Sequence, residues 1–518
     1  MNTVALVLLS TLALFVVKRL FGYRAALRSV QGHPGSRNII TPFGIFGFLV
    51  PEGLPGGICE GGLRSWYTKH RDFERYGVDI ISTISVFPQP EVVLQDITTS
   101  RARFPKPVIQ YEVLAFFGPN IVASEHEQWK RFRKVSAPAF SERNNRLVWD
   151  ETVKIMIDLF DNVWGEQKQI VVNHAVDVTL PIALFVIGVA GFGRRISWKD
   201  DLVVPPNHKM AFKDALHVVS LDVFYKIAVP GWIMKHFPTQ RMKKVCIAFE
   251  ELEQYMREMI HARRTAEKKE ERYDLFSSLL EASEDELDGT GSVKLTDQEL
   301  LGNIFIFLLA GHETTAHTLC FAFGLLALYP EKQENLYKHI KSIIPDGRIP
   351  TYDEMNLFTE SMAVFYETLR MFPPAHNVPK KAAEDTALHT QDADGNKIIV
   401  PVPQGTGIIL HLPGLHYNPR YWDDPYAFKP ERFLGDWPRD AFLPFSSGAR
   451  ACLGRRFFET EGIAILTMLV SRYKIAVKEE PQFAGETLEQ RQARILRAKA
   501  GLTLTPIRMP LVFTRRDA

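Results

Sequence analysis

The chain contains little cysteine and has almost no excess charge of either sign. Its 518 residues include four cysteines, at positions 59, 246, 320 and 452, and their spacing fits neither a disulfide framework nor a zinc site. This usage fits a reducing compartment. The 62 basic and 60 acidic residues leave a net charge of +2, which gives no reason to expect nucleic acid as a partner. Internal repeats and long low-complexity tracts are also missing, so nothing indicates a repeat protein.

Residues 445–454 read FSSGARACLG and follow the pattern F-x-x-G-x-R-x-C-x-G. A cysteine binds a metal as thiolate, and backbone N–H donors and a helix N-terminus both lower the pKa of the thiol. We expect Cys452 to have both, because residues 453–473 place apolar side chains at helical spacing. The alternative is an ordinary buried cysteine, which is the commonest state of a lone cysteine.

The neighbours of this cysteine suit a flat, anionic macrocycle that carries iron. Gly448 permits the turn that aims the cysteine, and Gly454 leaves no Cβ where the macrocycle must approach the backbone. Arg450 offers a fork of donors to a propionate, and Phe445 would shield the sulfur from water. We therefore interpret the segment as a haem-thiolate site with Cys452 as the iron ligand.

With these residues the chain resembles the cytochrome P450 family of haem-thiolate monooxygenases, and further segments match that family in order over most of the chain. The first lies in the long apolar segment 300–328. Thr296 and Glu299 predict a capping box at its start, and Tyr329-Pro330 predicts its end. The segment resembles the family's long helix over the distal face of the haem.

A single polar cluster, Ala310-Gly311-His312-Glu313-Thr314, interrupts this apolar segment. A buried carboxylate and hydroxyl are costly without partners, which favours a function over a solvent-facing polar stripe. The resemblance implies that Ala310 and Gly311 border the haem and that Gly311 opens a gap for dioxygen. It also implies that Thr314 hydrogen-bonds dioxygen and that Glu313 relays protons. We interpret His312 as a neighbour of the oxygen groove and not as an axial ligand.

Two further segments predict a charged network that holds the cysteine loop. Glu367 and Arg370 lie three apart, so they share one helix face, although such pairs are common on exposed helices. The segment Pro430-Glu431-Arg432-Phe433 resembles the family segment whose arginine joins that pair, here Arg432. One carboxylate between two guanidinium groups fixes geometry, because breaking a buried charge network typically costs about 3 to 5 kcal/mol.

A fourth segment, residues 129–133 with the sequence WKRFR, resembles the family helix that holds a haem propionate. The resemblance carries over to Trp129 and Arg133, which lie four apart on one face. One departure concerns Lys380, which stands where many members place a propionate-binding arginine. A lysine donates hydrogen bonds but offers no planar fork.

The same segment is basic, through Lys130, Arg131, Arg133 and Lys134. Such a run is usually a solvated face. The resemblance places it on the helix that faces the electron donor, and an acidic flavoprotein surface would be steered to it. We expect an NADPH-cytochrome P450 reductase as donor, with cytochrome b5 as a second candidate.

The N-terminus predicts a membrane anchor. Residues 4–17 are almost uninterrupted apolar sequence, and Lys18 and Arg19 follow. Leu20 and Phe21 extend the run toward the roughly 20 residues that a membrane helix needs. A retained anchor is favoured over a cleaved signal peptide, because no basic residue precedes the run and no A-x-A-like site follows it. The positive flank predicts a cytosolic catalytic domain.

The resulting organisation is a transmembrane anchor at 1–22, a proline- and glycine-containing irregular neck at 23–58 and a catalytic domain at 59–518. The fold expected from the resemblance is mainly α with a smaller β-rich part, in a single haem domain of the cytochrome P450 fold. The candidate strands are residues 78–84, 92–94, 397–400, 406–410 and 502–505.

The chemistry that the resemblance implies is insertion of one oxygen atom of dioxygen into a C–H bond, with haem b as cofactor and NADPH-derived electrons. The substrate pocket that the resemblance implies, which includes Phe307 and residues 501–504, is mostly apolar, so we expect a hydrophobic small molecule. The chain looks most like endoplasmic-reticulum fungal members that act on terpenoids or other secondary metabolites, with a fatty-acid hydroxylase as the alternative within the class. A reductase-independent haem-thiolate isomerase or dehydratase and a non-catalytic haem carrier or sensor are the alternatives from other classes.

Overall fold

The computed structural model describes residues 3–44, 47, 50, 52–88, 91–95, 104–194, 198, 204–236, 239–265, 274–284, 294–392, 394–499 and 501–516. The chain divides into two compact units, each built from three segments of sequence. Unit 1 comprises Met1–Pro107, Ala375–Ala427 and Pro438–Ala451, and unit 2 comprises Val108–Pro374, Phe428–Trp437 and Cys452–Ala518. The strands of the larger sheet belong to unit 1 and most helices belong to unit 2.

Unit 1 is built on a five-stranded mixed sheet of order β1-β2-β3-β8-β5. Strand β1 runs parallel to β2, β3 runs parallel to β8, and the other two neighbouring pairs are antiparallel. Its elements are α1 (Thr3–Ser29), β1 (Gly35–Ile40), α3 (Arg64–Thr68), α4 (Arg71–Tyr76), β2 (Ile81–Phe87), β3 (Glu91–Gln95), β5 (Asn377–Lys381), β6 (Thr386–Gln391), β7 (Lys397–Val402), β8 (Gly407–His411), α15 (Leu412–His416), η8 (Arg439–Ala441) and η9 (Gly448–Arg450).

The core of unit 1 lies on one face of this sheet and under the antiparallel hairpin β6–β7. Ile84, Leu94 and Ile408 of the sheet and Val400 of the hairpin are fully buried there. The C-terminal part of α1 packs against the same core through partly buried side chains, among them Leu27. Burial of such apolar side chains stabilises each by about 1.5 to 3 kcal/mol.

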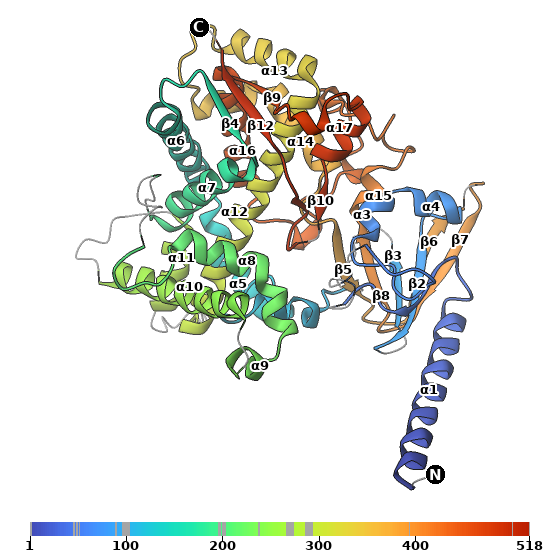
Figure 1. Ribbon diagram of the computed structural model, residues 1–518. Coiled ribbons are helices and arrows are strands. Elements are labelled where there is room, and N and C mark those ends of the chain that lie inside the picture. Colours follow the sequence, from blue (N-terminus) through green and yellow to red (C-terminus); the bar gives the residue numbers. More distant parts are fainter. Residues whose placement is uncertain are drawn as a thin grey trace. The chain divides into compact units, whose positions relative to one another are not determined.

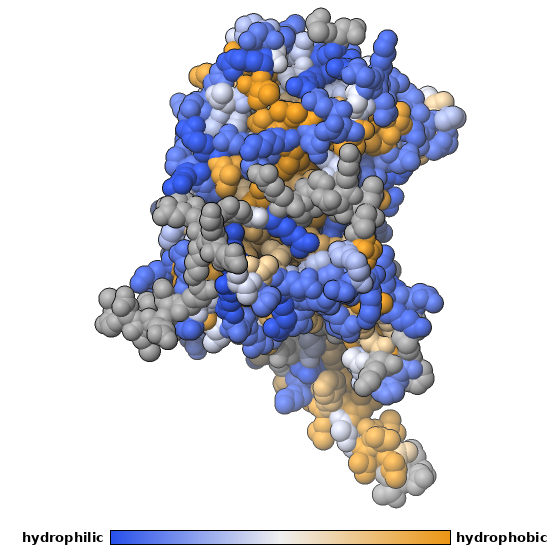
Figure 2. Space-filling model, turned by 90° about the vertical axis from the view of Figure 1, so that its left-hand side faces the viewer, coloured by the Kyte–Doolittle hydropathy of each residue, from blue (hydrophilic) through white to orange (hydrophobic). Residues whose placement is uncertain are grey.

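Helix α1 is long and apolar enough to cross a membrane, over Val4–Ser29, and no residue of its most apolar stretch is buried. Its N-terminal end leads away from the strands of unit 1 (Figure 1), and its apolar side chains are exposed at the lower end of Figure 2. Exposed apolar side chains over such a length fit a membrane anchor. The helix continues beyond the predicted boundary at residue 22.

The segment predicted as an irregular neck, residues 23–58, differs from that expectation. It contains the last turns of α1 and the strand β1, whose residues pair with β2 from Gly35–Ser82 to Ile40–Phe87. Four prolines suggested a neck, Pro34, Pro42, Pro51 and Pro55, and the first two flank the strand instead of interrupting it. Part of the predicted neck is therefore a strand of the sheet.

Unit 2 is a helical body around α12 (Asp297–Leu328), which runs among the other helices of this unit (Figure 1). Like α1, this helix is long and apolar enough to cross a membrane, but most of it is buried. A helix that is apolar on all sides belongs in a core. The predicted capping box is confirmed, because the Thr296 hydroxyl accepts from the Glu299 backbone N–H and the Glu299 carboxylate accepts from that of Thr296.

The other elements of unit 2 surround this helix, and a three-stranded antiparallel sheet of order β4-β12-β9 joins distant parts of the chain. They are η1 (Val108–Leu114), α5 (His126–Ser136), η2 (Ala137–Ala139), α6 (Glu142–Asp158), η3 (Leu159–Trp164), β4 (Gln169–Val172), α7 (Val176–Val186), η4 (Ile187–Gly191), α8 (Phe212–Ala228), α9 (Gly231–His236), α10 (Gln240–Arg264), α11 (Leu275–Glu284), α13 (Pro330–Ile343), η6 (Tyr352–Leu357), α14 (Thr359–Met371), η7 (Pro430–Phe433), α16 (Arg455–Arg472), β9 (Tyr473–Val477), η10 (Pro481–Phe483), α17 (Leu488–Ile495), β10 (Ala498–Lys499), β11 (Thr505–Pro506) and β12 (Leu511–Arg515).

Candidate active site

Cys452 lies in unit 2, two residues before Gly454, the N-cap of helix α16. The residue is exposed to solvent, although enough protein surrounds the sulfur that burial raises the pKa of the thiol. A hydrogen bond from the Gly454 backbone N–H and the charges of Arg455 and Arg133 act in the opposite direction. The N-terminal end of α16 also favours an anion at this position. The sulfur is thus accessible and has the donors that a thiolate ligand requires.

The loop before the cysteine belongs to unit 1 and turns sharply twice. Ser446 has a φ of 58° and Gly448 a φ of 64°, so the backbone at Gly448 is in the left-handed region that glycine adopts most readily. Phe445 and Arg450 are half-buried, and Gly448 is exposed. The loop is also held by a residue that sequence reasoning missed, because the Leu443 backbone N–H donates to Nε2 of the buried His416 at 3.0 Å.

Three cationic side chains of unit 1 gather near this loop. Lys106 is surrounded by protein, and burial, Arg450 and Lys380 together lower its pKa to about 7. An anion placed beside Lys106 would favour the charged form of this side chain. We did not predict Lys106 as a site residue. The only sequence feature that indicates it is its position between Pro105 and Pro107 in an apolar stretch. The cluster therefore offers donors for carboxylates.

Helix α12 exposes one narrow strip in its otherwise buried middle. Ala310 is exposed and Phe307, Gly311 and Thr314 are half-buried, and their spacing puts them on one face. The Thr314 hydroxyl donates to the Ala310 carbonyl at 2.8 Å. His312 is buried outside this strip, where its Nδ1 meets the Leu308 carbonyl at 2.8 Å and burial lowers its pKa to about 4.

Gly311 has a different structural setting from the one expected. A Cβ at this position would lie 2.9 Å from both Cδ1 and Cγ1 of Ile187, the first residue of η4. We expected the space beside Gly311 to be a gap for dioxygen. In the structure, the Ile187 side chain lies close to where a Cβ of this residue would be. The reason lies in packing, since the missing Cβ lets η4 come close to α12.

Glu313 points away from the strip and is almost completely buried, with 3% of its surface exposed. Burial raises the pKa of its carboxyl to about 8, while a hydrogen bond with the Thr503 side chain acts in the opposite direction. The carboxyl therefore holds its proton near neutral pH. It lies one residue from the accessible hydroxyl of Thr314, so a protonated carboxyl and a hydroxyl are adjacent in the helix sequence.

On helix α5, Trp129 is buried and the Arg133 guanidinium lies 5.7 Å from its ring centroid. The charge of Arg133 also acts on the Cys452 thiol and lowers its pKa. The basic run on this helix is shorter than predicted. Arg131 forms an ion pair with Glu299 of α12 and a 3.1 Å hydrogen bond to the Lys294 carbonyl, so it anchors two helices. Lys130 and Lys134 remain exposed.

Glu367, Arg370 and Arg432 come together in unit 2. Glu367 and Arg370 on α14 are fully buried and form two parallel hydrogen bonds, of 2.7 and 2.8 Å. Arg432 of η7 donates its Nε to Glu367 Oε1 at 3.3 Å, and the Lys429 backbone N–H donates to the same oxygen at 2.9 Å. The bidentate geometry is the strong form of this ion pair.

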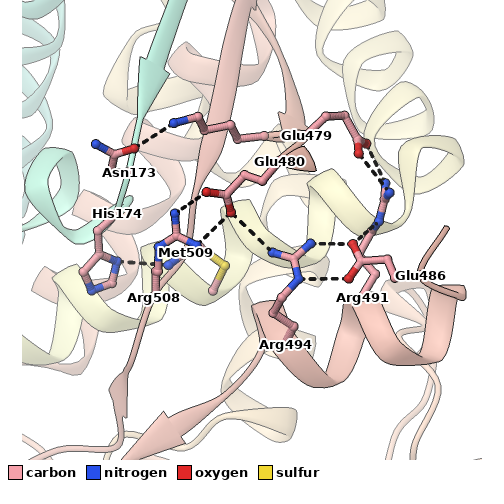
Figure 3. Close-up of polar contacts among 10 residues, drawn as sticks. Asn173, His174, Glu479, Glu480, Glu486, Arg491, Arg494, Arg508 and Met509 are labelled. Atoms are coloured by element: carbon pink, nitrogen blue, oxygen red, sulfur yellow. Dashed lines mark hydrogen bonds and ion pairs between the residues drawn. The ribbon is translucent and has the colours of Figure 1, made fainter. Parts of the chain in front are cut away.

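The segment that carries Thr503 is held by an ion network near the C-terminus (Figure 3). Arg508 donates to both oxygens of Glu480 at 2.7 and 2.6 Å, just beyond strand β11. Arg494 of α17 lies between Glu480 and Glu486, and Arg491 extends the network to Glu479. The backbone N–H of Met509 donates to His174 Nδ1 at 3.2 Å. The hairpin β10–β11 is therefore fixed from its C-terminal side.

The family is established by comparison with known proteins. The family model for Cytochrome P450 matches residues 84–499. "Cytochrome P450 monooxygenase 124" from Postia placenta (strain ATCC 44394 / Madison 698-R) is 56% identical over 523 residues, which cover 100% of both chains. "Ganoderic acid synthetase CYP5150L8" from Ganoderma lucidum is 26% identical over 453 residues, which cover 79% of this chain and 81% of the relative.

A solved structure, the haem domain of cytochrome P450DA, superimposes with a TM-score of 0.71 at 21% identity and covers 93% of this chain and 98% of that one. This likeness confirms the predicted fold, mainly helical with a small β part. The chain belongs to the cytochrome P450 family, and it is a cytochrome P450 monooxygenase of fungal type. Members of this family bind haem through a cysteine thiolate and use a redox partner and hydrophobic substrates.

Proposed function

We propose that this monooxygenase hydroxylates a C–H bond of a terpenoid or related hydrophobic secondary metabolite, with NADPH-derived electrons from a cytochrome P450 reductase. The observation that carries the proposal is the pairing on α12 of a buried, proton-holding carboxyl, Glu313, with the accessible hydroxyl of Thr314. A haem carrier, or an isomerase that rearranges a peroxide, has no need of such a pair. The activation of dioxygen consumes protons, and side chains positioned beside the reacting oxygen can supply them.

The residues of each unit fit parts of a haem. In unit 2, Cys452 is an accessible thiol with a backbone N–H donor and nearby positive charge, as an axial thiolate requires. In unit 1, Lys106, Lys380 and Arg450 form a cationic cluster that suits propionate groups. When bound, the haem supplies the activation of dioxygen and the oxidation of the C–H bond.

The other site residues would hold the haem, support the cysteine loop or supply protons from fixed positions. Trp129 and Arg133 would hold a propionate from α5, and Ala310 and Gly311 would border the macrocycle from the accessible strip of α12. Phe445, Gly448 and Gly454 would shape and shield the cysteine loop. Glu367, Arg370 and Arg432 would hold the backbone around η7 in place without taking part in the reaction. Thr314 would orient the oxygen species through its hydroxyl, and Glu313 would supply the proton.

The membrane and the electron donor complete the proposal. Helix α1 would anchor the protein in the endoplasmic reticulum membrane by a single span, with the catalytic part in the cytosol. The exposed Lys130 and Lys134 on α5 would steer an acidic flavoprotein to the protein, and cytochrome b5 would be the second candidate donor.

The terpenoid substrate is supported by the chain's likeness to a fungal protein named for the synthesis of ganoderic acid. The accessible part of α12 supports a hydrophobic substrate, since Phe307 and Ala310 line it. A fatty acid is the competing substrate class, because a long alkyl chain would contact the same apolar surface.

The test uses the full chain in microsomes with a reductase. Farnesol, lanosterol and lauric acid serve as probes, and the readouts are the carbon monoxide difference spectrum and oxygenated products. The Cys452→Ser variant is the control for thiolate ligation. We expect a strongly red-shifted Soret band, absent in the control, and NADPH-dependent hydroxylation of a terpenoid probe. Hydroxylation of lauric acid alone would overturn the substrate class, and haem without NADPH consumption would overturn the enzyme.

A further inference from the structure

Glu313 is connected to a second titratable side chain through one hydroxyl group. Thr503 hydrogen-bonds the Glu313 carboxyl, and the same Oγ1 lies 2.7 Å from Nδ1 of His317. His317 lies one helical turn after Glu313 on α12, with 4.0 Å between its Nδ1 and the carboxyl oxygen. All three residues are buried, with exposed fractions of 3% to 8%. The three side chains form a continuous chain in the order His317, Thr503, Glu313.

The hydroxyl is held in place by its own segment. The Leu504 backbone N–H, next to Thr503 in the chain, donates to the Pro374 carbonyl at 2.9 Å. The ion network of Figure 3 fixes the chain just beyond, through Arg508 and Glu480. Thr503 therefore faces Glu313 from a rigid support, as a group that transfers protons must.

Beyond His317 the groups lead toward the surface of unit 2. His174 and His217 lie close enough to act electrostatically on His317, as does Lys499 of β10. His174 and His217 are half-buried, and both interact electrostatically with Asp177. Asp177 and Lys499 are exposed. Titratable groups, two of them exposed to solvent, thus lie around His317 and its neighbours in this part of unit 2.

We propose that His317 and Thr503 form a proton relay that reloads Glu313 after each proton it donates. This proposal rests on the proposed monooxygenase function and specifies how its proton donor is recharged. When Glu313 has lost its proton, the Thr503 hydroxyl donates to the carboxylate and takes the Nδ1 proton of His317. His317 takes a proton from solvent at Nε2, and proton exchange with solvent returns the ring to the Nδ1-protonated tautomer before the next transfer. One O–H bond forms at Glu313, one solvent proton is consumed, and no electron moves.

The chemistry of the two relay residues fits this sequence. A hydroxyl accepts one proton while donating another, and neutral imidazole does the same through its two nitrogens. Burial, with the nearby histidines, lowers the pKa of His317 to about 3, so the ring rests in its neutral form. A purely structural contact would need only a hydrogen bond at Glu313. A relay also needs a hydrogen bond between the same hydroxyl and a second titratable group, and His317 forms this bond.

The test compares Thr503→Val, which removes the hydroxyl at nearly constant volume, with Thr503→Ser, which keeps it. Thr505→Val is the matched control, because it deletes a buried hydroxyl of the same hairpin that contacts only the Thr503 carbonyl among the contacts described. His317→Gln tests the other residue of the relay. The carbon monoxide difference spectrum of each variant shows that the protein is folded and carries thiolate-ligated haem.

Two readouts separate a relay from a structural role. With reductase and farnesol as the probe molecule, we expect Thr503→Val and His317→Gln to slow NADPH oxidation on the order of tenfold in H2O and to increase the solvent isotope effect. Thr503→Ser should restore both values. In infrared difference spectra, the protonated carboxyl band that Glu313→Gln removes should shift in Thr503→Val, because its hydrogen bond is lost.

The outcomes distinguish the relay from the function on which it rests. If the wild-type protein shows no thiolate-type spectrum or consumes no NADPH with reductase, the proposed function fails. If the wild type is active and Thr503→Val matches it in rate and isotope effect, the relay is refuted. The relay is also refuted if Thr505→Val is equally impaired, because the effect would then come from the hairpin and not from the hydroxyl.

Discussion

Replacing Glu367 by glutamine removes one negative charge from a fully buried site while keeping the shape of the side chain. In the structure this carboxylate accepts two hydrogen bonds from Arg370, one from Arg432 and one from the Lys429 backbone. The amide that replaces it can accept with only one of its two terminal atoms. Arg370, which has no exposed surface, would keep its charge and lose its bidentate ion pair with this carboxylate.

The expected cost follows from that geometry. Removing one partner of a buried ion pair typically destabilises a protein by about 3 to 5 kcal/mol, because an uncompensated charge stays buried. Glu431→Gln is the matched control in the neighbouring segment, since Glu431 is 54% exposed and pairs with Lys332 at the surface. An exposed pair contributes about 0 to 1 kcal/mol.

The assay is denaturant unfolding of the haem-loaded protein, followed by both tryptophan fluorescence and the carbon monoxide difference spectrum. We expect Glu367→Gln to lower the unfolding midpoint strongly and to lose the thiolate-type spectrum at lower denaturant than the fluorescence changes. Glu431→Gln should leave both transitions nearly unchanged. Equal, small effects of the two substitutions would refute the reasoning, because they would show that the buried carboxylate does not hold the surrounding backbone.

Further predictions concern the proton donor, the packing of α12 and the cationic cluster. Thr314→Ala should raise hydrogen peroxide release per NADPH, and unchanged coupling would contradict its role. Since burial raises the pKa of Glu313 from 4.5 to about 8, the folded protein keeps a proton that the unfolded chain loses, so the free energy of unfolding should fall between those pH values. Glu313→Gln should make that fall shallower, by up to about 1.4 kcal/mol per pH unit, in a urea titration across pH. Gly311→Ala should cost about 1 to 3 kcal/mol through contact with Ile187, and a second change, Ile187→Ala, should cost less in its presence than alone. Lys106→Met should speed haem loss to a haem-free acceptor protein roughly tenfold or more, since a hydrogen bond to a charged group contributes about 1.5 to 3 kcal/mol.

Local patterns predicted much of the helical part. The capping box at Thr296 and the proline at 330 bound α12 as the sequence indicates, because both signals act through neighbouring backbone groups. The helix after Cys452 begins at Arg455 and ends at Arg472, within a few residues of the prediction. Four of the five candidate strands lie on β2, β3, β7 and β8, and the fifth shares only Thr505 with β11.

The contacts that the sequence did not predict join residues far apart in the chain. Thr503 meets Glu313 across almost two hundred positions, and residues 501–504 were expected only as pocket lining. Lys106 joins Lys380 and Arg450 through the fold of unit 1. Neither helical nor strand periodicity carries such information. Strand β1 was missed for the same reason, since its partner β2 lies more than forty residues away.

The buried middle of α12 shows where stability alone does not explain the sequence. A helix that only filled the core could carry apolar residues at positions 312, 313 and 317, as it does over most of its length. It carries instead two histidines whose pKa values burial lowers to about 4 and about 3, and a carboxyl whose pKa burial raises to about 8.

Each of these pKa shifts shows that burial disfavours the charged form of the side chain. Burying such a polar group in an apolar environment costs folding free energy. Thr315, on the same turn, donates a hydrogen bond to Glu461 of α16 at 3.2 Å. Glu461 is also buried, and burial raises the pKa of its carboxyl. Local rules are broken most often where function requires it. Four polar side chains on two turns of one buried helix, each neutral and hydrogen-bonded or close to another titratable group, are therefore better explained by the proton transfer that we propose than by core packing.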